Sequence, residues 1–134
     1  MANRNIHGNW TMSFEDRLLQ SKVDGAFNIE GNLAWLEEVK SLVGSSKGGN
    51  TKPWVAFVDG RGWDMSPDDA TESTNEMINW MADNNCALLA ILHSNRVQRY
   101  AAKQRTSGQG IIQFFFDYDE AYQASIDKLQ ELQN

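Results

Sequence analysis

Cysteine and histidine are both scarce in this chain of 134 residues. The one cysteine, Cys86, excludes an internal disulfide and any zinc site built on several cysteines. Two histidines leave little material for a histidine-rich metal site. We therefore expect neither a metal nor another cofactor, and so little cysteine is typical of a protein from a reducing compartment.

Long apolar runs are missing as well. No stretch of about 18 apolar residues occurs, so the sequence predicts no transmembrane helix. The first ten residues carry Arg4, Asn5 and His7 with no apolar run behind them, which is the pattern of neither a signal peptide nor a transit peptide. We expect a cytoplasmic protein.

Positive charge is in short supply, because 12 lysines and arginines stand against 18 aspartates and glutamates, for a net charge of −6. A general nucleic-acid binder needs the opposite balance, so nucleic acid is not an expected partner. Residues 84–116 nevertheless contain no acidic residue, while Arg96, Arg99, Lys103 and Arg105 all lie there. Most such runs form the solvated face of a helix; the alternative is a patch for an acidic partner or a phosphate.

The size and composition are those of one globular domain. Hydrophobic residues make up 41% and charged residues 22% of the chain, both near the averages of folded proteins. A chain of this length can bury a core of its own but rarely divides into two domains. We therefore expect a single domain over residues 1–134.

The first part of the sequence predicts a hairpin. Residues 9–15 alternate large apolar residues with Thr11 and Ser13, the spacing of a half-buried strand. Residues 17–23 are predicted to return as the second strand, with the turn at residues 15–16.

A helix is predicted next, because the apolar spacing changes from two residues to about 3.6. Asn28 is a suitable N-cap, and Gly44 is the expected C-terminal stop. The apolar positions of this helix are Ile29, Leu33, Trp35, Leu36, Val39, Leu42 and Val43.

Three strand–helix units are predicted after a loop rich in glycine and serine at residues 45–52. The strands are expected at residues 54–58, 86–92 and 111–116, and the helices at residues 66–83, 96–105 and from Asp117 or Asp119 to 132. The buried stripe of the last helix is predicted at Tyr122, Ile126, Leu129 and Leu132. Runs that are apolar on both faces are typical of strands covered by helices, and we take 86–92 as the central strand. The predicted core residues of these strands are Val55, Phe57, Leu88, Ala90, Ile112 and Phe114. The order ββαβαβαβα predicts an α/β fold with a mixed sheet of about five strands and helices packed against it.

Short motifs at the ends of the predicted elements carry a family resemblance. They are Val23-Asp24-Gly25, Pro53-Trp54, the strand end at Asp59, the apolar strand 87–92, Phe116-Asp117 and Glu120-Ala121. In this order they resemble the SpoIIAA-like (STAS/SEC14-type) family of small bacterial domains over nearly the whole chain, from residue 10 to residue 132. The resemblance implies a STAS-like sheet and a function in binding other proteins, as in anti-sigma factor antagonism, rather than an enzymatic activity.

The same resemblance draws attention to Ser66. Antagonists of this family carry an Asp-Ser-Ser-Gly-like segment, with a phosphorylated serine, where the helix after the middle strand begins. The matching segment here reads Asp64-Met65-Ser66-Pro67, with proline in place of glycine. Ser66 is thus either a phosphorylation site at a helix N-terminus or simply the N-cap, a role worth about 1 kcal/mol, and we favour the N-cap.

Polar side chains stand where the predicted strands end. In an open α/β sheet ligands bind beyond the carboxyl ends of the strands, so Asp59, His93 and Asp117 are expected to share one edge, with Arg61 and Asp64 in the following loop. An acid, a base and a cation that met there would suit general acid–base catalysis. The alternative is structural, with the aspartates as caps and the histidine as a polar strand end. No catalytic motif stands out, and we assign no catalytic residue.

The segment Gly60–Ser66 is predicted to be a loop and the functional edge of the molecule. Its two glycines are expected to let the backbone move, and it presents Arg61, Trp63 and Asp64. An exposed tryptophan in a loop is typical of a binding surface.

Two functions from different classes follow from these features. The first is a non-enzymatic regulatory domain that binds a protein through Gly60–Ser66 and the basic helix that contains Arg96 and Arg99. The second is a domain that binds a small anionic or lipid ligand, as in SEC14-type proteins, or a minor enzyme, with its site in the crevice near His93. A closed crevice would favour the first function, and a deep apolar pocket with converging polar groups the second. The sequence leaves the oligomeric state open.

Overall fold

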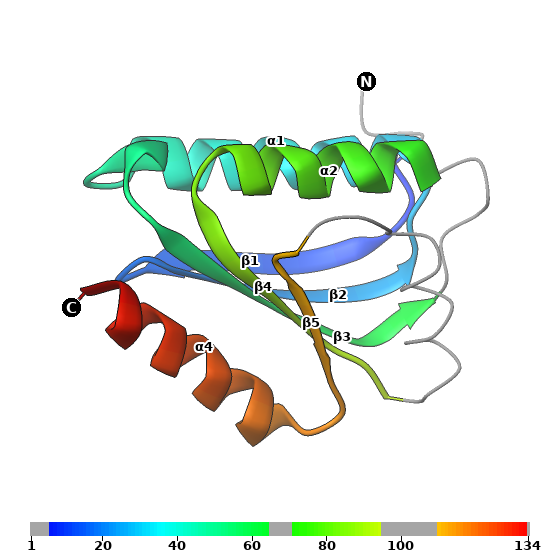
Figure 1. Cartoon of the computed structure of the whole chain (residues 1–134). Helices are drawn as coiled ribbons and strands as arrows, with labels where there is room; N and C mark the ends of the chain where they lie inside the picture. Colours follow the sequence, from blue (N-terminus) through cyan, green and yellow to red (C-terminus); the bar gives the residue numbers. More distant parts are fainter. Residues whose placement is uncertain (1–5, 65–70, 95–109, 134) are drawn as a thin grey trace.

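The computed structural model of the chain describes residues 6–64, 71–94 and 110–133, which form a mixed sheet with helices on both faces (Figure 1). The strands are β1 (Asn9–Glu15), β2 (Leu18–Ala26), β3 (Trp54–Asp64), β4 (Cys86–Leu92) and β5 (Ile112–Phe115). The helices are α1 (Ile29–Ser45), α2 (Thr71–Asp83) and α4 (Tyr118–Gln133), and a 3₁₀ turn, η2 (Gly49–Thr51), follows α1.

The spatial order of the strands is the same as their order in the chain, β1-β2-β3-β4-β5. β1 pairs antiparallel with β2, and every later pair is parallel. The prediction of an α/β fold with a mixed five-stranded sheet is therefore confirmed. The central strand, however, is β3 and not β4, and residues 54–60 of β3 are all buried.

A two-residue turn joins β1 to β2. Asp16 and Arg17 both have positive φ angles, 52° and 68°, and Glu15 pairs with Leu18 across the turn. Positive φ at both central residues is the type I′ geometry, whose twist matches that of the flanking strands. The predicted hairpin is confirmed, but its turn lies at residues 16–17 rather than 15–16.

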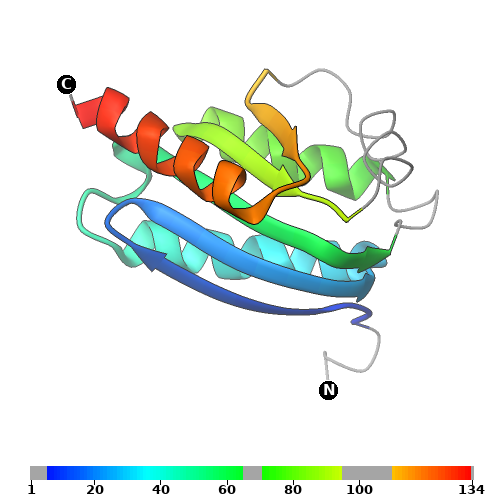
Figure 2. The ribbon, with the colours of Figure 1, turned by 90° about the horizontal axis from the view of Figure 1, so that it is seen from below.

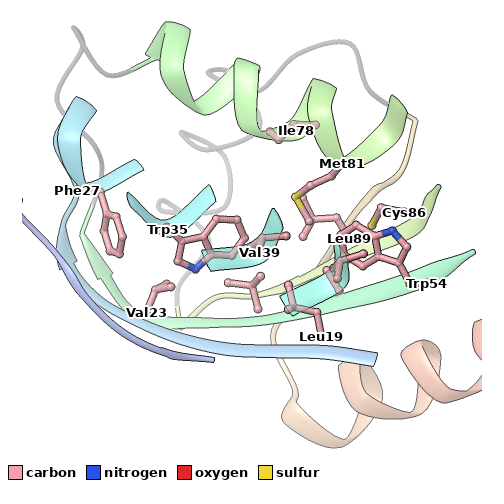
Figure 3. Packing of buried hydrophobic residues seen from close by; sticks show 13 residues of the cluster. Leu19, Val23, Phe27, Trp35, Val39, Trp54, Ile78, Met81, Cys86 and Leu89 are labelled. Carbon is pink, nitrogen blue, oxygen red and sulfur yellow. The ribbon is translucent and has the colours of Figure 1, made fainter. Parts of the chain in front are cut away.

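The two faces of the sheet are covered unequally. α1 and α2 lie on one face, where the larger core cluster includes Leu19, Trp35, Val39 and Trp54 (Figure 3). α4 lies on the other face, over β3, β4 and β5 (Figure 2). On that second face Leu18 of β2 still packs into the cluster under α4, but no helix among the described residues covers β1 or the rest of β2.

The predicted core is confirmed for the middle of the sheet and is looser near β5. Val55, Phe57 and Ala90 are buried between the sheet and α4. Leu88, Ile112 and Phe114 are only half-buried, since β5 is a short edge strand with a neighbour on one side only.

The helices depart from the prediction at one helix end and in which side chains of α1 and α4 are buried. The Asn28 side chain accepts a hydrogen bond from the Gly31 N–H, as an N-cap should, but α1 continues through Gly44 to Ser45. Two predicted stripe positions of α1, Ile29 and Leu33, are exposed. In α4 the buried positions are Ala121, Ser125 and Leu129, whereas Tyr122 of the predicted stripe is exposed.

Two helix predictions reach beyond the described residues. The start of the helix at Ser66 and the whole basic helix 96–105 lie outside them. No helix in the described part of the chain is both long enough and apolar enough to cross a membrane.

Candidate functional site

A groove lies on the α4 side of the sheet, between the β1–β2 hairpin and the start of α4. Its volume is about 380 Å³. Its walls come from β1, β2, β3 and Tyr118 of α4, and its polar residues include Thr11, Ser13, Gln20, Lys22 and Asp59. We call it the α4-side groove. On this face α4 lies over β3, β4 and β5 and leaves most of the β1–β2 hairpin uncovered (Figure 2).

Asp59, which lines the α4-side groove, forms an ion pair with Arg61. The guanidinium donates from Nε to Asp59 Oδ1 at 3.0 Å and from Nη2 to Oδ2 at 2.8 Å, and the Arg61 backbone N–H also donates to Oδ1 at 3.2 Å. The carboxylate side chain is 11% exposed, whereas that of Arg61 is 49% exposed. The arginine is therefore fixed in place at one end and accessible to solvent on the other side.

The electrostatics of Asp59 follow from this geometry. Burial raises the pKa of the carboxyl, but the hydrogen bonds and charge of Arg61, with a smaller effect from Lys22, outweigh burial and leave the pKa below its usual value. Asp59 is thus ionised at neutral pH and already bonded to Arg61. An ionised, occupied carboxylate is a poor general acid, so the arrangement suits a structural role for Asp59.

Two tyrosines of α4 continue the surface beyond Arg61. The Arg61 guanidinium lies 5.5 Å from the centre of the Tyr118 ring, and Tyr118 stacks on Tyr122 at 6.5 Å with an angle of 8° between the rings. Phe57, buried beneath, meets both rings edge-on. We call Arg61, Tyr118 and Tyr122 the Arg61–Tyr118 patch. Exposed arginine and tyrosine, held rigidly, are the residue types that dominate protein-binding surfaces.

His93 lies on the opposite face of the sheet from Asp59. Asp59 pairs with Leu92, and because side chains alternate along a strand, the next residue, His93, points toward the α1 and α2 face. There the imidazole lies 5.5 Å from the rings of both Trp63 and Phe114 and is fully buried. The strand ends do share one edge, as predicted, but the predicted meeting of acid, base and cation is wrong.

Residues 60–64 are strand rather than loop. β3 continues to Asp64, and its last residues pair with Asp24, Gly25 and Ala26 of β2. A side chain at Gly62 would collide with the carboxylate of Asp24, so this glycine permits a close approach and does not serve mobility. The prediction of a mobile loop is wrong for this part.

The other predicted site residues are spread over different surroundings. Trp63 is half-buried beside His93, and Asp64 is exposed at the end of β3. Asp117 accepts a hydrogen bond from the Glu120 N–H at 3.0 Å and so caps α4. Ser66, Arg96 and Arg99 lie outside the described residues.

A second hollow, of about 80 Å³, lies between the sheet and helices α1 and α2. Its lining is almost wholly apolar and includes Phe27, Trp35, Trp63 and Met77. The exception is a small polar group in which Asn32 Nδ2 donates to Ser73 Oγ at 2.9 Å and to Thr74 Oγ1 at 3.2 Å. We call this hollow the α1/α2 cavity; several of its neighbours appear in Figure 3.

Neither thiol chemistry nor a metal cluster is apparent in the described part of the chain. Burial raises the pKa of the Cys86 thiol to about 12, although hydrogen bonds with the backbone of Leu88 and Ala56 lower it slightly. The thiol is therefore neutral and unreactive in the folded protein. Within residues 6–64, 71–94 and 110–133, no three His, Cys, Asp or Glu side chains gather as metal ligands would.

The sequence predicted neither the tyrosines Tyr118 and Tyr122 nor the polar groove residues Thr11, Ser13, Gln20 and Lys22 as site residues. The tyrosines are four residues apart on one helix, a spacing that brings side chains together. The apolar stripe predicted for this helix, however, includes Tyr122 as a buried residue and so gives no sign of a surface pair. The contact of Tyr118 with Arg61 joins residues far apart in the sequence, and no local pattern indicates it.

Solved structures share this fold. An uncharacterized protein of the DUF3478 family with a SpoIIAA-like fold, from Shewanella loihica PV-4, is 19% identical with a TM-score of 0.64 over 88% of this chain and 94% of that one. An anti-sigma factor antagonist from Mycobacterium paratuberculosis is 11% identical with a TM-score of 0.62 over 90% and 95% of the two chains. The anti-sigma factor antagonist SpoIIAA in its unphosphorylated form is 8% identical with a TM-score of 0.60 over 91% and 98%.

At these identities the comparisons establish the fold, which is SpoIIAA-like, as the sequence motifs predicted. No family model matches the sequence, and no curated protein sequence matches it either.

Proposed function

We propose that this chain is a regulatory domain that acts by binding a protein, without catalysis, and that the partner binds at the Arg61–Tyr118 patch and the adjoining α4-side groove. The observation that carries the proposal is the exposed tyrosine pair, with Arg61 held over the Tyr118 ring by Asp59. The SpoIIAA-like fold supports the same class of function, because two of the structural neighbours are anti-sigma factor antagonists.

The patch is prepared for binding before a partner arrives. Arg61 is held by two side-chain hydrogen bonds to Asp59, and the two tyrosine rings rest on Phe57, so little side-chain freedom is lost on contact. Tyr118 is 41% exposed and offers both an apolar ring and a hydroxyl. The neighbouring groove, with the Lys22 ammonium and the hydroxyls of Thr11 and Ser13, offers a polar rim.

Site-specific photo-crosslinking tests the location of binding. A photoreactive phenylalanine analogue is introduced at Tyr118 and, in a separate protein, at Leu33 of α1, which has a matched exposure of 39%. In the native cell lysate we expect one protein to be crosslinked from position 118 and not from position 33. That protein, identified by mass spectrometry and then purified, is the binding partner for all further measurements.

Alanine variants complete the test with the purified partner. Tyr118→Ala combined with Tyr122→Ala should weaken binding at least tenfold, because paired aromatic anchors contribute a large share of binding energy. Leu33→Ala should bind like the wild type. The thermal midpoint of each variant serves as the folding control. Undiminished binding by a folded double variant would refute the proposed site.

A second candidate function rests on the α1/α2 cavity, where an apolar wall contains the Asn32, Ser73 and Thr74 hydrogen-bond group. Pockets for whole small molecules are usually about 300–1,000 Å³, so a cavity of about 80 Å³ has room for a short apolar group only. Titration with octanoate, followed by tryptophan fluorescence, should show saturable binding that Met77→Trp abolishes by filling the space. A fluorescence response without saturation in the wild type would dismiss this candidate.

A further inference from the structure

Within the described part of the chain, strand β1 has no neighbouring strand on its outer side and forms one edge of the sheet. It stands at the end of the strand order and is seven residues long, whereas β5 at the other edge has four (Figure 2). Natural edge strands are commonly protected by lysine, proline or a bulge. β1 reads NWTMSFE, which contains neither lysine nor proline, and its register with β2 runs without a bulge.

The hairpin geometry decides which backbone groups point outward. In a two-residue hairpin the residues that flank the turn, here Glu15 and Leu18, exchange hydrogen bonds, and the pairs then alternate along the strands. The N–H and C=O groups of the odd-numbered residues in β1 therefore face β2. Those of Trp10, Met12 and Phe14 face away from the sheet and can pair with another strand.

We propose that two copies of this chain associate through antiparallel pairing of β1 with β1, which makes one continuous sheet across a two-fold axis at Met12. The sequence of β1 is nearly symmetrical about that residue. With Met12 opposite Met12 of the second copy, Trp10 lies opposite Phe14 and Thr11 opposite Ser13. The aromatic side chains thus lie opposite aromatic side chains on one face of the sheet, and the hydroxyl side chains lie opposite hydroxyl side chains on the other face.

The same register lets the outward backbone N–H and C=O groups form hydrogen bonds and keeps the two Glu15 carboxylates apart. Trp10, Met12 and Phe14 each meet another outward-facing residue, and three such pairs form about six hydrogen bonds. A shift by one residue would set outward groups against inward ones and lose them all. Glu15 lies opposite Asn9 of the second copy, so the carboxylates stand at opposite ends, each facing an amide. Parallel pairing in register would instead place the two Glu15 side chains together.

Assembly state and disulfide trapping test this proposal. We expect light scattering after size-exclusion chromatography to give a mass twice the 15.2 kDa of the chain. Thr11→Lys with Ser13→Lys sets lysine against lysine at two cross-strand positions and should halve the mass. Gln113→Lys, which adds charge to the exposed face of β5, is the matched control and should leave the mass unchanged.

Cysteine variants test the register and do not depend on the lysine variants folding. Residues that form a hydrogen-bonded antiparallel pair have Cα atoms about 5.5 Å apart, within the range of a disulfide. Met12→Cys should crosslink into a dimer under mild oxidation, whereas Glu15→Cys, which lies opposite Asn9, should not. The proposal would be overturned if the wild type were a monomer at all concentrations, or if the lysine variant remained a dimer. Equal crosslinking of Met12→Cys and Glu15→Cys would overturn it as well.

Discussion

The hydrogen bond between Trp35 and Ser21 fixes α1 against β2, and its contribution can be measured. The indole Nε1 donates to Ser21 Oγ at 3.0 Å, and both residues are only 4% exposed. Ser21→Ala removes the acceptor and little else, which leaves a buried N–H without a partner. Such a group costs about 1–3 kcal/mol, so we expect the free energy of unfolding to fall by that amount.

A double-mutant cycle separates the hydrogen bond from packing. Trp35→Phe removes the donor and part of the ring, so it should cost more than Ser21→Ala alone. In the Trp35→Phe background the serine has no indole to bind, and Ser21→Ala should then cost less than about 0.5 kcal/mol. The coupling energy between the two positions should therefore be about 1–2 kcal/mol.

Urea unfolding followed by circular dichroism is the assay, with the m-value checked for constancy. Ser13→Ala, an exposed serine on the neighbouring strand, is the matched control and should change stability by less than about 0.5 kcal/mol. If Ser21→Ala were as harmless as Ser13→Ala, or equally costly in both backgrounds, the hydrogen bond would not be the cause.

Three further predictions concern the core and the titrating groups. Leu89→Ala should lower the free energy of unfolding by about 2–5 kcal/mol, and Leu88→Ala by only about 1–2 kcal/mol in the same urea assay, because Leu89 is buried and Leu88 half-buried. The raised pKa of Cys86 means that folding favours the neutral thiol. Its contribution to stability is complete below the unfolded pKa of about 8.5 and is lost as pH rises toward 12, so Cys86→Ala should flatten the stability curve there. Arg61→Gln should raise the pKa of Asp59, visible as a shifted carboxyl carbon titration in NMR spectra; in the wild type this stabilisation is lost as pH falls through the depressed pKa.

The elements that the sequence predicts well are those with local signals. The alternation of Trp10, Met12 and Phe14 identifies β1, and the Asn28 side chain marks the start of α1, because each depends on residues close in the chain. The prediction of β4 as the central strand is wrong because β3 and β4 carry equally apolar runs. Only the sheet order, which depends on distant pairing, distinguishes them.

The candidate site was harder to predict because it depends on which face of the sheet each side chain occupies. Topology alone brings Asp59 and His93 to the same edge, but the register of β3 with β4 sends them to opposite faces. Gly60 and Gly62 resemble loop residues locally, yet β3 runs through both and Gly62 pairs with Asp24 of β2. The stacking of Arg61 on Tyr118 joins β3 to α4 and has no counterpart in sequence spacing.

The match between strand order and chain order bears on how the protein is made. A ribosome releases β1 and β2 first, and the hairpin closes through a short turn. Each later strand then adds to the outer edge of the one before it, so no strand has to be inserted between two that already pair. Parallel strands must wait for their crossovers, which slows each addition. The most apolar strands, β3 and β4, thus emerge with a template already in place, which shortens the time during which they can aggregate.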